Sequence, residues 1–518
     1  MSENKAIPVL DLFAGPGGLG EGFSSLLSKR EKPVFKIALS IEKDPSAHLT
    51  LELRSFFRQF SKENVPDDYY AFLRQKITRE ELFQRHPKAA EAAKKEACQA
   101  TLGEVDEDEL DGWIYKALQG KEKEWVLIGG PPCQAYSLAG RSRNKGIEDY
   151  SAEADDRHFL YKEYLRIIAK HWPSVFVMEN VKGILSSKVK GERIFDRIRE
   201  DLRNPGKAIG TDEKYSYKIF SLVPSNDDLF GRSGDYVIRC EEYGIPQARH
   251  RVILLGVRCC EDSKKREPNV LTRKIPATVK SVLSQLPKIR SGLSRDNNGK
   301  TWGETIGEIK TAQWLEKLPN ELKEILLKHL DNIKKEGVLL PETGCIFIKE
   351  KPKISKQFVA WFLDPKIKGV CNHISRGHMA SDLHRYFYAA CYAELYGVSP
   401  TLGDFPEELL PKHKSVSKAL ETKSHFSDRF RVQVWNRPST TVTCHIAKDG
   451  HYYIHPDPVQ CRSLSVREAA RLQTFPDNYF FCGSRTAQYT QVGNAVPPLM
   501  ARKIARIVAE LLQLEGRH

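Results

Sequence analysis

The 518-residue sequence lacks several features that would place it in particular classes of protein. No run of about 18 consecutive apolar residues occurs, so no segment is expected to cross a membrane. The N-terminal residues lead directly into the strand-like Ile7–Phe13 without the apolar stretch of a signal peptide. We therefore expect a cytoplasmic protein. The sequence also shows no internal repeat and no low-complexity tract.

The eleven cysteines form no Cys-x-x-Cys spacing, and the only close pair is the adjacent Cys259 and Cys260. This distribution suits neither a zinc site nor a compact disulfide framework. The histidines His373, His378 and His384 likewise fit no familiar ligand spacing, so local hydrogen bonds or phosphate contacts are the favoured interpretation. We expect mostly buried, reduced thiols and no bound metal.

Positive charge is in excess, with 81 Lys and Arg against 67 Asp and Glu, a formal net charge of +14. Between Cys259 and Trp435 there are 30 basic and 21 acidic residues, so much of the excess lies in about a third of the chain. A basic surface can serve solubility alone. It also favours a polyanionic partner such as nucleic acid.

The first 258 residues alternate short apolar runs with helical patterns, which predicts an α/β sheet flanked by helices. Arg54–Leu118 reads as a helical insertion of charged residues. After Arg258 the alternation gives way to an irregular Lys-, Pro- and Gly-rich region, and a helical pattern returns from Arg462. The expected strands are Val9–Phe13, Lys36–Ile41, Trp125–Ile128, Ser174–Met178 and Val252–Val257, with helices over Leu19–Ser28 and Leu160–His171.

A glycine-rich loop with Gly15, Gly17 and Gly18 separates the first strand from the first helix. Glu42 ends the next strand, about 24 residues further on. A carboxylate there can accept the ribose hydroxyls of a nucleoside cofactor. Pro16 interrupts the Gly-x-Gly-x-x-Gly fingerprint of dinucleotide sites, so a nucleoside with a small cationic tail is favoured over NAD.

Cys133 follows the strand-like Trp125–Ile128 in the turn Gly129-Gly-Pro-Pro-Cys133. A lone cysteine is most often a buried structural residue, whereas a nucleophilic one needs an exposed, electropositive setting. Other strand ends provide candidate partners. Glu179 ends an apolar strand, and Gln247, Arg249 and Arg251 alternate just before another, which predicts that these three share one face.

A thiolate, a carboxylic acid and guanidinium groups together suit addition to an electron-poor ring. In cytosine, thiolate attack at C6 makes C5 nucleophilic if N3 is hydrogen-bonded or protonated at the same time. C5 can then capture an electrophilic methyl group.

With these residues in place, the sequence resembles the cytosine-C5 DNA methyltransferases of bacterial or phage modification systems. The matching motifs, in chain order, are Phe13-Ala-Gly-Pro-Gly-Gly18, Glu42, Pro131-Pro-Cys-Gln134, Asp156-Arg157 to Leu160, Glu179-Asn-Val181, Gln247-Ala-Arg-His-Arg251, Arg467-Glu-Ala-Ala-Arg471 and Gln491-Val-Gly-Asn-Ala-Val496.

The resemblance implies a role for each matching residue. Cys133 would attack C6, Glu179 would engage N3 and the exocyclic amine, and Arg249 and Arg251 would hold the cytosine carbonyl or a nearby phosphate and support Cys133. The loop 134–150, with Arg141, Arg143 and Lys145, would act as a lid. The S-adenosylmethionine site would be lined by Phe13, Gly15, Gly17, Leu19, Glu42, Pro132, Leu160, Asn494 and Val496. The acid that meets adenine in the family stays open among Glu104, Asp106 and Asp108.

The family's architecture implies a Rossmann-like catalytic domain over 1–258, including the helical insertion at 54–118. An irregular target-recognition domain would cover 259–459, and 460–518 would return to the catalytic domain. The implied partner is double-stranded DNA, whose target cytosine is flipped out of the duplex. We expect a monomer in the bacterial cytosol or nucleoid, within a restriction-modification system that includes a restriction endonuclease encoded nearby.

Three alternative classes of protein share part of this pattern. The tRNA-modifying branch of the family shares the catalytic motifs but carries a Cys-Phe-Thr signature that this sequence lacks. A non-catalytic relative would be expected to have lost Cys133 or Glu179, and both are present. An unrelated Rossmann oxidoreductase is disfavoured by Pro16 and by the Pro-Cys element.

Overall fold

The computed structural model describes residues 6–119, 124–132, 157–189, 192–211, 214–224, 236–259, 267–294, 299–335, 343–411 and 428–512. Its largest element is a mixed sheet with the strand order β3-β2-β1-β4-β5-β11-β8, in which β9 also pairs with β11. The strands β3, β2, β1, β4 and β5 are parallel, and β11 is antiparallel to β5, β8 and β9. The strands are β1 (Ile7–Leu12), β2 (Phe35–Glu42), β3 (Ala97–Gln99), β4 (Val126–Gly129), β5 (Val175–Val181), β8 (Tyr217–Phe220), β9 (Val237–Arg239) and β11 (His250–Arg258).

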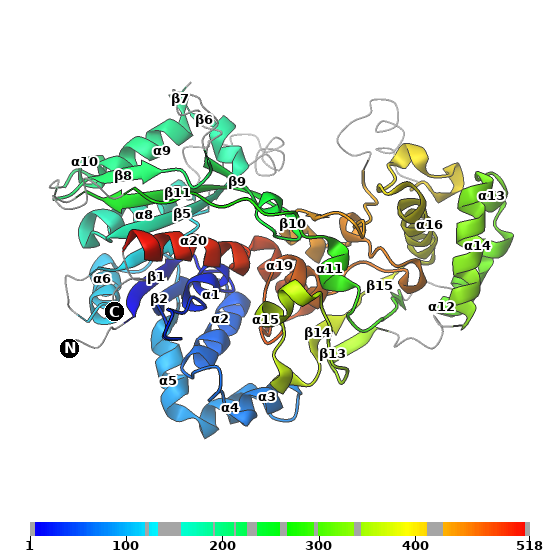
Figure 1. Ribbon diagram of the computed structural model, residues 1–518, viewed down its shortest axis with the longest axis horizontal. Coiled ribbons are helices and arrows are strands. Elements are labelled where there is room, and N and C mark those ends of the chain that lie inside the picture. The colour runs from blue at the N-terminus through cyan, green and yellow to red at the C-terminus, as the bar shows by residue number, and fades with distance from the viewer. Residues whose placement is uncertain are drawn as a thin grey trace.

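Alternate residues of these strands pack on opposite faces of the sheet, as the two-residue period of a strand requires. Val9 faces a core shared with α1 and α20, whereas its neighbour Leu10 faces a core shared with α6, α8 and α9. The sheet is therefore the middle of three layers (Figure 1). The helices of these layers are α1 (Gly18–Ser24), α6 (Glu107–Ala117), α8 (Arg157–His171), α9 (Ile194–Arg203), α10 (Pro205–Ile209) and α20 (Pro498–Leu511). A small hairpin of β6 (Lys188–Val189) and β7 (Glu192–Arg193) precedes α9.

The C-terminal helix α20 returns to the beginning of the chain, as the sequence predicts. Figure 1 shows it, in red, beside the blue α1. A Cβ atom on Gly22 of α1 would lie 2.3 Å from the Cβ of Ala501, so the two helices approach more closely than any larger residue would permit. Met500, Ile504 and Val508 of α20 join the core on this face of the sheet.

The segment expected as a helical insertion contains more than helices. It begins within α2 (Pro45–Arg58) and includes α3 (Asp67–Leu73), α4 (Arg79–Arg85) and α5 (Pro87–Glu96). It then supplies β3, the edge strand of the main sheet, and α6, whose Leu110 and Ile114 are part of a sheet core.

The α3 region also connects the main sheet to the following lobe. The Tyr70 hydroxyl donates to Asp364 Oδ2 at 2.8 Å, and Asn478 Nδ2 donates to the same oxygen at 2.9 Å. Arg74 Nη1 donates to the Lys366 carbonyl at 2.9 Å. These bonds join three parts of the chain that are far apart in sequence, so the segment acts as a brace between the two lobes.

The region after Arg258 forms a second lobe, at the right of Figure 1, with small two-stranded sheets and a helical core. Its central helix α16 (Ala380–Tyr396) packs against α12 (Trp302–Gly307) and α14 (Asn320–Lys335). Its other α-helices and strands are α11 (Val279–Leu283), α13 (Gln313–Glu316), α15 (Val359–Phe362), β12 (Gly292–Leu293), β13 (Gly344–Ile348), β14 (Val370–Ile374), β15 (Gly377–His378) and β16 (Ser439–Thr440). Strand β16 pairs with β10 (Gln247–Ala248), which precedes this region in the chain.

Helix α18 (Val466–Leu472) anchors this lobe through side chains that are charged yet fully buried. Arg462 and Glu468 pair at 2.6 Å, and Arg471 pairs with Asp477 at 2.6 Å. A buried ion pair is stable only when its remaining polar atoms are bonded. The second guanidinium nitrogen of Arg462 accordingly bonds the other Glu468 oxygen at 2.7 Å, and its Nε donates to the Ile289 carbonyl at 2.9 Å.

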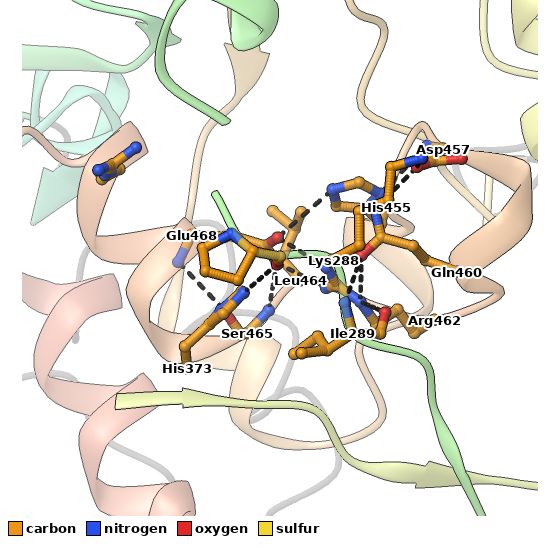
Figure 2. Close-up of polar contacts among 12 residues, drawn as sticks. Lys288, Ile289, His373, His455, Asp457, Gln460, Arg462, Leu464, Ser465 and Glu468 are labelled. Atoms are coloured by element: carbon orange, nitrogen blue, oxygen red, sulfur yellow. Dashed lines mark hydrogen bonds and ion pairs between the residues drawn. The ribbon is translucent and has the colours of Figure 1, made fainter. Parts of the chain in front are cut away.

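Figure 2 shows how this cluster ties the lobe to α18. The ring of His373 bonds Ser465 Oγ at 2.7 Å through Nδ1 and the Pro287 carbonyl at 2.8 Å through Nε2. Burial lowers the pKa of His373 to about 4, so the ring is neutral. His384 Nε2 likewise bonds the Thr305 carbonyl at 2.7 Å. These contacts agree with the prediction of local hydrogen bonds for the histidine cluster.

Candidate active site

The glycine loop after β1 turns sharply into α1. Phe13, Gly15 and Gly17 all have positive φ values, of 57°, 57° and 92°. A Cβ on Gly17 would lie 2.9 Å from both Leu51 Cδ1 and Tyr479 Oη, and a Cβ on Gly18 would lie 2.3 Å from the Val496 carbonyl oxygen. The loop therefore requires glycine both for its conformation and for the close approach of the C-terminal segment.

Glu42 stands at the end of β2 and is bonded to this loop. Its Oε2 accepts the Gly15 N–H at 2.7 Å, and its Oε1 accepts the Asp44 N–H at 2.8 Å. Burial raises the pKa of Glu42, and the two backbone N–H groups oppose that rise. Each carboxylate oxygen can accept a second hydrogen bond, so this side chain can also receive the hydroxyls of a ligand.

A cavity of about 450 Å³ opens above the ends of β1, β2, β4 and β5. Its walls come from both ends of the chain. Among the residues predicted for the cofactor, those that line it are Phe13, Gly15, Leu19, Glu42, Pro132, Leu160, Asn494 and Val496. Gly17 does not line it, and instead supports the loop from below against Leu51 and Tyr479.

Helix α19 (Arg485–Asn494) forms the C-terminal wall of the cavity and also contacts the second lobe. Thr490, Gln491 and Asn494 face the cavity. On its other side, a Cβ at Gly493 would lie 2.3 Å from the backbone nitrogen of Cys444. One helix thus touches both the predicted cofactor site and the predicted target-recognition domain.

Glu179 lines the same cavity from the end of β5. Its Oε1 pairs with Arg251 Nε at 2.7 Å, and both side chains are about one-seventh exposed. A Cβ on Gly130 would lie 2.9 Å from Glu179 Oε2, and Asn180 Nδ2 donates to the Pro131 carbonyl at 3.2 Å. The turn that leads to Cys133 therefore runs directly past the Glu179 carboxylate. Cys133 itself and the loop 134–150 lie outside the described residues.

The two arginines predicted to share one face have different surroundings. Arg251 reaches Glu179, whereas Arg249 is fully buried and its Nη1 donates to the Val442 carbonyl at 2.8 Å. Burial and the neighbouring Arg251 lower the pKa of Arg249 to about 9. Gln247 bonds the same segment by accepting the Val442 N–H at 2.8 Å. Neither arginine lines the cavity. Arg249 and Gln247 instead connect the segment at the start of β11 to the second lobe.

None of the three acids considered for the adenine position lines the cavity. Asp106 caps α6 by accepting the backbone N–H groups of Asp108 and Glu109. The wall at this position comes instead from Ala100, Thr101 and Leu102, which follow β3. Sequence reasoning missed these residues because β3 has only three residues and follows directly on a helical pattern.

The arrangement suits a nucleoside ligand that carries a reactive tail. Apolar side chains of Phe13, Leu19 and Leu160 line the walls, and a carboxylate oriented by backbone N–H groups stands at one side. A carboxylate–guanidinium pair stands at another side, next to the turn that precedes Cys133. Ligand binding and a reaction involving proton transfer can therefore take place in one continuous cavity.

Comparisons with known proteins identify a family of similar sequences. The family model described as C-5 cytosine-specific DNA methylase matches residues 87–510. Type II methyltransferase M.Bpa9945I of Bacillus paralicheniformis is 34% identical over 531 residues, covering 98% of this chain and 100% of that protein. DNA (cytosine-5-)-methyltransferase M.ApeKI of Aeropyrum pernix is 28% identical over 455 residues, covering 80% of this chain and 87% of that protein.

Among solved structures, a prophage-encoded protein of E. coli assigned as a DNA modification methyltransferase aligns with a TM-score of 0.51 at 18% identity. The alignment covers 98% of this chain and 100% of that one. At this identity the match speaks to the fold alone. Within the described residues, no helix combines the length and apolarity needed to cross a membrane.

Proposed function

We propose, on the premise that the chain belongs to the C-5 cytosine-specific DNA methylase family, that it transfers the methyl group of S-adenosylmethionine to C5 of a cytosine in duplex DNA. Family membership makes it a DNA (cytosine-5-)-methyltransferase. The observation that carries the remainder of the proposal is that one cavity is lined by both Glu42 and Glu179, whose carboxylate is paired with Arg251.

The cavity residues fit S-adenosylmethionine. Glu42 would accept the ribose hydroxyls, while Phe13 and Leu160 would pack on the base and Asn494 and Val496 would close the site. When bound, the cofactor supplies an electrophilic methyl group. The volume of about 450 Å³ lies in the range of small-molecule sites.

The chemistry proposed for the chain's own residues begins with the thiolate of Cys133. It adds to C6 of the cytosine, forming an S–C6 bond, while Glu179 donates a hydrogen bond or proton at N3. Electron density moves to C5, which forms a bond to the methyl group as the bond between that methyl group and the cofactor sulfur breaks, leaving S-adenosylhomocysteine. Loss of the C5 proton to a base then breaks the S–C6 bond and restores the thiolate. Such attack requires the cytosine to leave the base stack.

Arg251 would act through Glu179. Its guanidinium fixes one carboxylate oxygen at 2.7 Å and leaves the other free to face the cytosine. Arg249 would act on the second lobe, because its bond to the Val442 carbonyl holds that segment against the catalytic strand. This refines the earlier expectation that both arginines contact the substrate.

The second lobe, residues 259–459, would be the target-recognition domain that reads duplex DNA. Its basic excess supports this assignment, because cations meet phosphates while other side chains read base edges. The relatives named type II methyltransferases support a place in a restriction-modification system with a restriction endonuclease encoded nearby. We propose that the enzyme works as an intracellular monomer.

Incubation with DNA and S-adenosylmethionine labelled in the methyl group tests the activity. After digestion to nucleosides, the label is expected in 5-methylcytosine. Label in another nucleoside, or label only when tRNA replaces DNA, would reject the proposal.

The covalent step has its own test. Wild-type protein should form a denaturant-resistant adduct with duplex DNA containing 5-fluorocytosine, since fluorine at C5 blocks release of the enzyme. Cys133→Ser should form none and should lose turnover by several orders of magnitude while still binding DNA. An adduct that persists in this variant would remove Cys133 from the mechanism.

A further inference from the structure

Three cations lie together on the C-terminal helix α20, away from its core-facing side. Lys503 follows Arg502 directly, and Arg506 comes three residues after Lys503. The three side chains therefore occupy adjacent turns of the helix. Arg506 is exposed, and Arg502 and Lys503 are half-buried. None of them lines the cofactor cavity.

The segment that follows β11 adds a fourth cation beside this helix. Asn269 Nδ2 donates to Glu510 Oε2 of α20 at 2.8 Å, and Leu271 shares a core with the apolar residues of α20. These two contacts hold the segment along the helix. Its exposed Lys274 is close enough to Lys503 to influence that group electrostatically.

The four cations have no carboxylate partner within the described chain. None takes part in an ion pair there, and Arg502 Nε is buried without a hydrogen-bond partner. Two carboxylates of this region are engaged elsewhere. Glu510 accepts from Asn269, and Glu242 pairs with Arg239 and Arg273 at 3.5 Å each.

Lys503 shows the consequence for charge. Burial, together with the neighbouring Lys274, Arg506 and Arg502, lowers the pKa of Lys503 to about 8. Cations gathered without counter-charges repel one another and destabilise the folded state. A bound polyanion would remove that cost.

Two further features relate the cations to the second lobe and to the cavity. Arg502 lies 5.5 Å from the ring centroid of Trp361 in α15, so the patch extends to the second lobe. Helix α20 starts two residues after Val496, which lines the cavity. With a rise of 1.5 Å per residue, Lys503 and Arg506 lie roughly 8 and 12 Å along the helix from its start.

We propose that Lys274, Arg502, Lys503 and Arg506 form a second DNA-binding surface, which holds phosphates of the duplex that flanks the target cytosine. The inference rests on the proposed DNA methyltransferase function and adds a contact outside both the cavity and the target-recognition domain. Guanidinium groups bind phosphate through paired hydrogen bonds, and ammonium groups bind it as point charges. The surface would strengthen binding without reading sequence.

The test compares wild-type protein with Lys503→Glu/Arg506→Glu. The matched control, Lys88→Glu/Lys94→Glu, makes the same change in net charge on exposed residues of α5. Fluorescence anisotropy measures binding to duplexes of about 12 and about 40 base pairs over a range of salt concentrations. Lys503→Gln/Arg506→Gln provides a milder variant, and thermal melting checks that every variant is folded.

The Lys503→Glu/Arg506→Glu variant should lose about tenfold or more in affinity for the long duplex and little for the short one. The slope of log affinity against log salt should become shallower by about 2 for the long duplex, since each phosphate contact contributes about 0.9. The glutamine variant should change in the same direction. The α5 control should keep the wild-type slope.

The proposal is overturned if the α20 variant and the α5 control lose affinity equally, or if the long and short duplexes are affected alike. The proposal is also overturned if the α20 variant loses affinity for RNA or for an acidic protein surface but keeps wild-type affinity for duplex DNA. Methyl transfer at saturating plasmid DNA distinguishes the proposed second surface from the proposed methyltransferase function, because the α20 variant should keep wild-type turnover there. A wild-type protein without methyl transfer would reject the proposed function, whereas the dependence on duplex length would still test the surface.

Discussion

Replacing Gly18 by alanine should weaken cofactor binding, because the new methyl group would push apart the two ends of the chain that form the cavity. The added Cβ would lie 2.3 Å from the Val496 carbonyl oxygen and 3.2 Å from the Val496 nitrogen. A comfortable contact between carbon and oxygen is about 3.3 to 3.6 Å. The C-terminal wall must therefore retreat by roughly 1 Å.

Overpacking of this kind costs about 1–3 kcal/mol. If the wall at Asn494–Val496 moves, most of this cost appears as lost cofactor affinity, which corresponds to roughly 5- to 150-fold in Kd. If the wall stays in place, the cost appears as a lower melting temperature. Titration calorimetry with S-adenosylmethionine, together with thermal melting of the free protein, measures both quantities.

Gly112→Ala is the matched control. A Cβ there meets nothing within 4 Å, and Gly112 lies inside helix α6. Alanine should stabilise that helix by about 0.5–1 kcal/mol and leave cofactor affinity unchanged. If Gly18→Ala bound the cofactor as the wild type does and melted at the same temperature, Gly18 would not hold the C-terminal wall and the reasoning would be refuted.

Three further substitutions test other parts of the structure. Glu179→Gln should reduce turnover by about 10²- to 10⁴-fold with little change in cofactor affinity, because it removes the proton donor but not the cavity wall; equal turnover would exclude that role. Burial raises the pKa of the Asp11 carboxyl from 3.8 to about 7. The folded state therefore binds this proton more tightly than the unfolded state does, and the free energy of unfolding of the wild type should fall as pH rises from about 4 to 7. Denaturation of Asp11→Asn should show a smaller fall, with a difference on the order of a few kcal/mol above pH 7, and parallel pH profiles would contradict this assignment. Asp364→Ala removes the acceptor for Tyr70 in the brace between the lobes and should cost about 1–3 kcal/mol of unfolding free energy, whereas an unchanged denaturation midpoint would show that the brace contributes nothing.

Much of the catalytic sheet could be predicted from the sequence because its strands are apolar and long enough to show a pattern. The predicted Val9–Phe13 and Lys36–Ile41 correspond to β1 and β2 within a residue or two. Strand β3 could not be predicted because three residues are too few to show an alternation of apolar and polar side chains, and its pairing partner β2 lies more than fifty residues earlier. The residues after β3 that line the cavity were missed for the same reason.

Alternation just before a strand predicts that these side chains share a face, but it does not determine what each side chain contacts. Gln247 and Arg249 point toward the segment around Val442, almost 200 residues away, and only Arg251 turns to Glu179. The contacts of a buried arginine depend on which distant carbonyl the fold brings to it. No local pattern in the sequence contains that information.

The central claim is that one cavity joins a nucleoside cofactor to cytosine chemistry at Glu179 and Cys133. Its most direct test follows the label from methyl-labelled S-adenosylmethionine into duplex DNA for the wild type and for Cys133→Ser. Label is expected exclusively in 5-methylcytosine for the wild type and in no nucleoside for the variant. Label in any other nucleoside, or undiminished 5-methylcytosine from the variant, would contradict it.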